Sequence, residues 1–261
     1  MNLSYTTYGS GPVIVLIHPG GVDSREWQGL VPLLAKTHQV VIFDARGTGR
    51  SPAPQEPMQP VKDVLELLDH LKLDRVTLVG HSMGGELATN LTLSYPERVD
   101  RLIVVAPALT GFSFSDTYTG WMQELNSFAP DIEKMTRFSL DAAIYKNVMA
   151  SDYRDLFIDM HTQYFKRVFT EWRSFEVIWP QPPAIERLEN IKVPTLFVYG
   201  SDEWSDMSDI AAEFKRVPKI SFAKLEGADH MIPLTHFKEL SSHIHSFLHD
   251  HFTHSAAYQQ E

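Results

Sequence analysis

Short apolar runs rich in β-branched residues recur along the chain, and stretches with helical spacing separate them. The runs are continuous and do not alternate with polar residues, which is typical of strands buried on both faces of a parallel sheet. They lie at residues 13–17, 40–43, 76–79, 102–105 and 195–199. Between them, residues 60–71 and the stretch after Ser82 carry apolar residues three and four positions apart. This alternation predicts an α/β fold with a mostly parallel central sheet and helices on both faces.

The two ends of the pattern differ from its middle. Residues 3–8 and 13–17 flank Gly9-Ser10-Gly11, which predicts a β-hairpin and an antiparallel sheet edge. At the other end, residues 220–225 are expected to form the last strand, and a final helix is expected from about residue 233 to residue 249.

The alternation of strands and helices stops between residues 108 and 190. This stretch has no convincing strand run and holds 15 of the 29 aromatic residues, with spacings that suggest several helices. We therefore expect an α/β core at 1–107 and 191–250, an inserted helical cap at 108–190 and a flexible tail at 251–261.

Composition and charge narrow the function. The chain has 261 residues, a formal net charge of −10 and no cysteine. An acidic surface disfavours nucleic-acid and anionic-membrane partners, and the lack of cysteine excludes thiolate chemistry. No signal peptide, membrane span, metal-ligand spacing or complete dinucleotide motif is visible. We expect a cytoplasmic protein that needs no cofactor and no metal and acts on a small molecule; the oligomeric state is left open.

A serine at a predicted strand-to-helix turn is the first candidate for chemistry. Ser82 lies in Gly80-His81-Ser82-Met83-Gly84-Gly85, directly after the run at 76–79 and before a helical pattern. Such a turn leaves little room around the serine, so glycines two positions before and after it are needed. The turn would lift the hydroxyl above the sheet edge, at the amino-terminal end of a helix that favours developing negative charge.

A candidate carboxylate and a candidate base follow the serine along the chain. His230 lies in a loop after the expected strand at 220–225, and it is the natural base for the serine. Asp202 and Glu203 follow the run at 195–199, and either could orient the imidazole.

Main-chain donors for a tetrahedral intermediate can also be placed. The N–H of Met83 begins the helix after the serine, and the loop after residues 13–17 contains Gly20 and Gly21. Gly20 is the first choice for the second donor and Gly21 the alternative. The aromatic and methionine enrichment of the cap predicts an apolar acyl pocket. Its expected lining includes Phe114, Trp121, Met122 and Phe165.

These motifs, in this order and spacing, resemble the α/β-hydrolase superfamily over about residues 3–248. They are HPGG at 18–21, DARGTGRS at 44–51, GHSMGG at 80–85, YGSDE at 199–203 and GADH at 227–230. The resemblance implies a capped, esterase-like serine hydrolase. The family position of the acid favours Glu203 over Asp202, although aspartate is usual there, and His18-Pro19 stands where His-Gly is usual.

The expected activity is cleavage of small or medium acyl carboxylic esters through an acyl-enzyme. Carbon–carbon bond hydrolysis, lactone opening or perhydrolysis on the same triad are alternatives within enzymes. A ligand receptor or signalling protein that keeps the fold and triad without turnover is the alternative outside enzymes.

Overall fold

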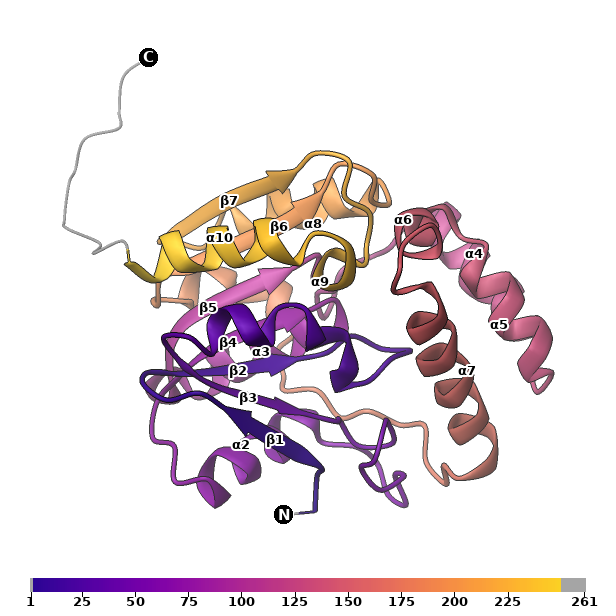
Figure 1. Cartoon of the computed structure of the whole chain (residues 1–261), viewed down its shortest axis with the longest axis horizontal. Helices are drawn as coiled ribbons and strands as arrows, with labels where there is room; N and C mark the ends of the chain where they lie inside the picture. The colour runs from indigo at the N-terminus through magenta and orange to yellow at the C-terminus, as the bar shows by residue number, and fades with distance from the viewer. Residues whose placement is uncertain (1, 250–261) are drawn as a thin grey trace.

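The computed structural model describes residues 2–249, in which seven strands form one sheet with helices on both faces (Figure 1). The strand order is β1-β3-β2-β4-β5-β6-β7, and every neighbouring pair is parallel except β1 with β3. The strands are β1 Tyr5–Tyr8, β2 Val13–Ile17, β3 Gln39–Phe43, β4 Val76–His81, β5 Val99–Val105, β6 Thr195–Gly200 and β7 Ile220–Leu225. The predicted α/β-hydrolase fold class is confirmed.

Each inner strand places alternate side chains in two separate apolar cores. In β2, Val15 and Ile17 pack on the side of the sheet covered by α2, α3 and α8, whereas Ile14 and Leu16 pack on the side of α1 and α10. All four side chains are almost completely buried. The continuous apolar runs of the sequence therefore reflect a sheet that is covered on both faces.

Ten α-helices and five short 3₁₀ helices complete the described part of the chain. The α-helices are α1 Val31–Leu34, α2 Pro60–His70, α3 Met83–Ser94, α4 Asp116–Ser127, α5 Ile132–Leu140, α6 Lys146–Met149, α7 Arg154–Thr170, α8 Asp206–Phe214, α9 Ile232–Thr235 and α10 Phe237–His249. The 3₁₀ helices are η1 Ser24–Gln28, η2 Pro96–Arg98, η3 Ala143–Tyr145, η4 Ala184–Glu186 and η5 Leu188–Asn190. The expected single last helix is wrong in detail, because the backbone leaves helical geometry at His236, between α9 and α10.

The predicted amino-terminal hairpin is also wrong, although the antiparallel edge is present. β1 pairs with β3, and β2 lies between β3 and β4. The connection between β1 and β2 packs against the loop before β3: a Cβ on Gly9 would collide with the carbonyl oxygens of Ala35 and His38. This packing places the start of β3 between the two strands, and β2 then gains a parallel neighbour on each side.

The segment between β5 and β6 forms helices α4 to α7, which stand together on the right of Figure 1 beside the carboxyl ends of the parallel strands. Two small apolar clusters hold these helices together, one around Phe157 and one around Leu125 and Phe165. We propose that residues 108–190 act as a cap over this edge of the sheet. The predicted flexible tail, residues 251–261, lies outside the described residues.

Candidate active site

Ser82 occupies a strained turn between β4 and α3. Its backbone angles are φ 52° and ψ −117°, a left-handed conformation that side-chain-bearing residues rarely adopt. Two hydrogen bonds fix the turn: its N–H donates to the carbonyl of Val105 (2.9 Å), and its carbonyl accepts from the N–H of Ala108 (3.0 Å). Strain of this kind persists only when the surrounding structure imposes it, and it is common at catalytic positions.

The two glycines flanking Ser82 are required by close main-chain approach. A Cβ on Gly84 would collide with the carbonyl oxygen of Ile17, and a Cβ on Gly80 would collide with the main chain of Gly84. These contacts press the start of α3 against the end of β2, and so the serine turn lies next to the loop that follows β2.

His230 is held by a carboxylate. Its Nδ1 donates to Glu203, at 3.0 Å from Oε1 and 3.1 Å from Oε2, and the carboxylate side chain is only 3% exposed. Burial lowers the pKa of His230, but nearby carboxylates, Glu203 foremost, together outweigh burial, and the net pKa lies above the ordinary value for histidine. With its proton on Nδ1, the imidazole keeps Nε2 as its basic nitrogen.

Asp202 lies elsewhere. It is exposed, and its Oδ1 accepts a hydrogen bond from the hydroxyl of the preceding Ser201 (2.8 Å). The structure therefore brings Glu203 to His230, and among the described contacts Asp202 makes none with that ring.

The proposed oxyanion donors lie beside the serine. Met83 is the first residue of α3, a position whose N–H has no acceptor within the helix. Gly20 faces it across the turn, since a Cβ on Gly20 would contact the Met83 sulfur at 2.5 Å. Gly21 has φ +80° and packs against His161 of α7. Both glycines, Met83 and Ser82 line one cavity.

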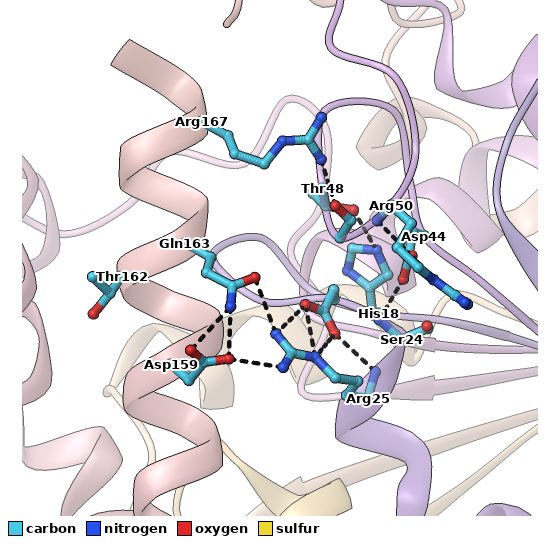
Figure 2. A network of polar contacts seen from close by, with 12 residues as sticks. His18, Ser24, Arg25, Asp44, Thr48, Arg50, Asp159, Thr162, Gln163 and Arg167 are labelled. Atoms are coloured by element: carbon cyan, nitrogen blue, oxygen red, sulfur yellow. Dashed lines mark hydrogen bonds and ion pairs between the residues drawn. The ribbon is translucent and has the colours of Figure 1, made fainter. Parts of the chain in front are cut away.

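His18 shapes the loop that carries these glycines. The loop carbonyl of Pro19 accepts from its Nδ1 (2.7 Å), and its Nε2 accepts from the N–H of Ala45 (2.9 Å). Asp44, at the start of the DARGTGRS turn, accepts from the N–H groups of Ser24 (3.0 Å) and Arg50 (2.9 Å) (Figure 2). Burial raises the pKa of Asp44, but these hydrogen bonds outweigh it and leave the pKa below its usual value. The turn thus supports the loop without entering the cavity.

The cavity that contains Ser82 and His230 has a volume of about 290 Å³. All four residues expected in the acyl pocket line it: Phe114, Trp121, Met122 and Phe165. The sequence prediction missed further members of the wall, namely Tyr118, Tyr145, His161, Tyr164 and Trp204. Their aromatic character was visible in the sequence, but the way that they face one hollow was not.

Residues of the segment between β5 and β6 also form hydrogen bonds with the loop that carries His230. The N–H of His230 donates to the carbonyl of Ile144 (3.1 Å). Asn147 donates twice to the same loop, through its main-chain N–H to Asp229 (2.6 Å) and through its side chain to the carbonyl of Gly227 (2.6 Å). No sequence signal pointed to Ile144 or Asn147, because their partners lie about eighty residues away.

A polar network joins helix α7 to the turn after β2. Figure 2 shows Arg25 reaching across to Asp159 (2.7 Å). The same guanidinium also donates to Asp23, two residues before it. Farther along the same helix, Arg167 donates to the main-chain oxygens of Gly49 (2.7 Å) and Ser51 (2.8 Å). The helix that bears His161 is therefore tied to the core at two points.

Two further properties of residues 2–249 bear on function. In this part of the chain, no group of three or more His, Asp or Glu side chains is arranged as a possible metal site. Within the same residues, every helix is too short or too polar to pass through a bilayer.

Comparison with known proteins identifies the family and the fold of this chain. A family model described as "Alpha/beta hydrolase family" matches residues 14–242. A pimeloyl-[acyl-carrier protein] methyl ester esterase of Aeromonas hydrophila is 26% identical over 254 residues, covering 95% of this chain and all of that protein. The protein of the same name from Legionella pneumophila (strain Corby) is 28% identical, covering 90% of this chain and 95% of its own length.

Solved structures show the same fold at lower identity. A hydrolase from Pseudomonas aeruginosa PA01 superposes with a TM-score of 0.78 at 22% identity, covering 95% of this chain and 94% of that one. A bromoperoxidase from Bacillus anthracis gives a TM-score of 0.77 at 23% identity, covering 95% of each chain. With the family model matching most of its length, this chain belongs to the alpha/beta hydrolase family.

Proposed function

We propose that this chain is a serine hydrolase that cleaves small or medium acyl esters through an acyl-enzyme intermediate. One observation carries the proposal: Glu203 holds His230 through Nδ1, and both line the same cavity as Ser82 on its strained turn. Nucleophile, base and orienting acid are thus gathered in one place.

The proposed reaction uses the chain's own groups throughout. The Ser82 hydroxyl attacks the ester carbonyl while Nε2 of His230 takes its proton, and the charge on the resulting oxyanion is stabilised by the N–H groups of Met83 and Gly20, with Gly21 as the alternative. His230 then gives the proton to the departing alcohol. Water, deprotonated by the same nitrogen, attacks the acyl-enzyme and releases the carboxylic acid and free Ser82.

The cavity supports an uncharged acyl group as substrate. Its wall is mostly apolar, and none of the described residues that line it is Lys or Arg, whereas Glu203 and Asp206 both line it. A carboxylate on the substrate would meet buried acids with no cation to pair with it. The esterase names of the relatives support an ester as the reacting group.

The direct test is steady-state hydrolysis of p-nitrophenyl esters of graded acyl length, with a lactone included to separate ring opening from open-chain ester cleavage. Ser82→Ala should reduce turnover by about 10⁶-fold, the effect of losing such a nucleophile elsewhere. A fluorophosphonate should label Ser82, as mapped by mass spectrometry. Ser94→Ala, at the far end of α3, is the matched control and should keep wild-type rates.

Two outcomes would contradict the proposal. Retention of a tenth of wild-type activity by pure Ser82→Ala protein would exclude Ser82 as the nucleophile. A single burst of product followed by no turnover would instead indicate a receptor that traps its ligand.

A further inference from the structure

Behind the proposed base lies a buried acid–imidazole contact that the reaction above does not use. Glu26 belongs to η1, and His81 is the last residue of β4, immediately before Ser82. Neither side chain has any exposed surface, and Oε2 of Glu26 lies 3.1 Å from Nδ1 of His81. A buried pair of ionisable groups is costly unless hydrogen bonds satisfy its polar atoms.

The second nitrogen of His81 fixes the tautomer. Its Nε2 lies 2.8 Å from the main-chain carbonyl oxygen of His230. A carbonyl oxygen can only accept a hydrogen bond, so Nε2 must carry a proton. Nδ1 is then either a lone pair that accepts from Glu26 or, in an imidazolium, a second donor.

Burial favours the uncharged arrangement. Desolvation raises the pKa of Glu26 well above its ordinary value, and it lowers the pKa of His81 to about 3. An uncharged His81 with its proton on Nε2 presents a lone pair at Nδ1, so its hydrogen bond with Glu26 at 3.1 Å requires a protonated carboxyl that donates it. Oε1 of Glu26 has no hydrogen-bond partner among the described residues, which an uncharged acid tolerates better than a carboxylate does.

The turn that carries Glu26 is itself well anchored. Asp23 caps η1 by accepting from the N–H of Arg25, and the N–H of Ser24 donates to Asp44. The Arg25 side chain is tied to Asp159 of α7 on the outer side of the turn (Figure 2). Glu26 is thus presented inward from a rigid element.

We propose that Glu26 and His81 are a positioning pair for His230: Glu26 donates to His81, and His81 donates to the main-chain carbonyl of His230. This inference rests on the proposed role of His230 as the base. Because the N–H of His230 donates to Ile144, the pair completes a hold on both sides of that residue's main chain. These hydrogen bonds fix the position of the His230 main chain relative to Ser82, while Glu203 fixes the rotation of the imidazole ring.

An uncharged pair has a second effect, on the strength of the base. The titratable groups that face the pair are His18, Asp23, Glu203 and His230. An ionised Glu26 would raise the pKa of His230, because the two groups interact electrostatically. A protonated Glu26 holds the loop without adding that charge.

The test compares two substitutions of Glu26. Glu26→Gln keeps a donor for Nδ1 of His81, so kcat should stay within about threefold of wild type, with an unshifted acidic limb of the pH profile. Glu26→Leu removes the donor, and misplacement of the base should lower kcat by about 10- to 100-fold with little change in KM. Asn90→Leu is the control: Asn90 lies on α3 and, like Glu26, has a fully buried polar side chain. Its removal should lower the melting temperature but leave kcat unchanged.

Two results would overturn the pair. Wild-type kcat in Glu26→Leu would show that His230 needs no such hold. A shift of the acidic limb to lower pH in Glu26→Gln would show that Glu26 is ionised in the native protein.

A readout independent of activity separates this inference from the proposed function. In the Ser82→Ala protein, histidine ¹⁵N spectra should show His81 protonated on Nε2 and unprotonated on Nδ1 from about pH 5 to pH 9, a range well above its lowered pKa. Both nitrogens protonated would contradict the pair even if Glu26→Leu failed to fold. If the wild-type protein hydrolyses no ester, the proposed function fails while these spectra still decide the state of the pair.

Discussion

At the scale of single residues, the contact between His230 and Glu203 determines which acid should matter. Glu203→Gln should lower turnover by about 10⁴-fold, the loss measured for an orienting carboxylate elsewhere. Asp202→Asn, the adjacent matched control, should change it by less than tenfold, because Asp202 contacts Ser201 and is exposed. Initial rates at fixed pH decide the matter, and collapse of Asp202→Asn alone would reverse the assignment.

The same contact predicts the pH dependence of the reaction. In the proposed mechanism His230 must be unprotonated to act as the base. Burial lowers the pKa of His230, but nearby carboxylates, Glu203 foremost, raise it above the ordinary histidine value. In wild type, kcat/KM should therefore fall as the pH drops through that raised pKa. Glu203→Gln should move this limb to lower pH, because the imidazolium loses its counter-charge. If the acidic limb of the pH profile of Glu203→Gln, measured on its residual activity, coincides with that of wild type, then Glu203 does not raise the pKa of His230.

Local sequence was enough to nominate Ser82, His230 and the adjacent acids Asp202 and Glu203, because each lies in a short motif after a predicted strand, and the family resemblance then favoured Glu203. It did not reveal Glu26, whose partner His81 is 55 residues away along the chain. Motifs carry information about local geometry, whereas a buried pair depends on how two distant elements pack.

At the scale of elements, the junction of β4 and α3 depends on main-chain contacts so close that a Cβ atom at Gly80 or Gly84 would not fit. Gly84→Ala should lower the free energy of unfolding by about 2–3 kcal/mol, because its Cβ would meet the backbone of β2 and only a shift of α3 could relieve it. Gly120→Ala in α4 is the opposite case. Its Cβ would meet nothing, so the substitution should stabilise the protein by about 0.5–1 kcal/mol.

Urea unfolding midpoints of the two variants provide the measurement. A midpoint of Gly84→Ala equal to that of wild type would show that α3 can shift to accommodate the added Cβ at no cost in stability.

Elements that are buried on both faces were predictable, since burial imposes continuous apolar runs such as Val13–Ile17. The pairing of β1 was not, because sequence proximity favoured a hairpin while the packing of Gly9 against Ala35 placed β3 between the strands. The cap illustrates the same limit: helical spacing predicted helices, but only tertiary packing sets which side chains face the cavity.

At the scale of the whole molecule, charge should decide among substrates of equal size. The chain carries a formal net charge of −10, and the described wall of the cavity contains acids but no Lys or Arg. An ester with a carboxylate on its acyl chain should have a kcat/KM at least about tenfold below that of its neutral isostere, and the difference should narrow as salt screens the repulsion. A competition assay at two ionic strengths measures this, and a preference for the anion would refute it.

Chimaeric proteins that exchange the proposed cap would lose hydrogen bonds to the His230 loop. The hydrogen bonds from Asn147 and to the carbonyl of Ile144 come from the inserted segment and not from the α/β core. Replacing residues 108–190 with the corresponding insertion of a relative would remove these hydrogen bonds from the loop that carries His230, the proposed base. Libraries that diversify substrate range should therefore retain residues 144–147 and vary the helices around them. A variant with a new pocket but without these contacts should lose activity, because its His230 is no longer held in position.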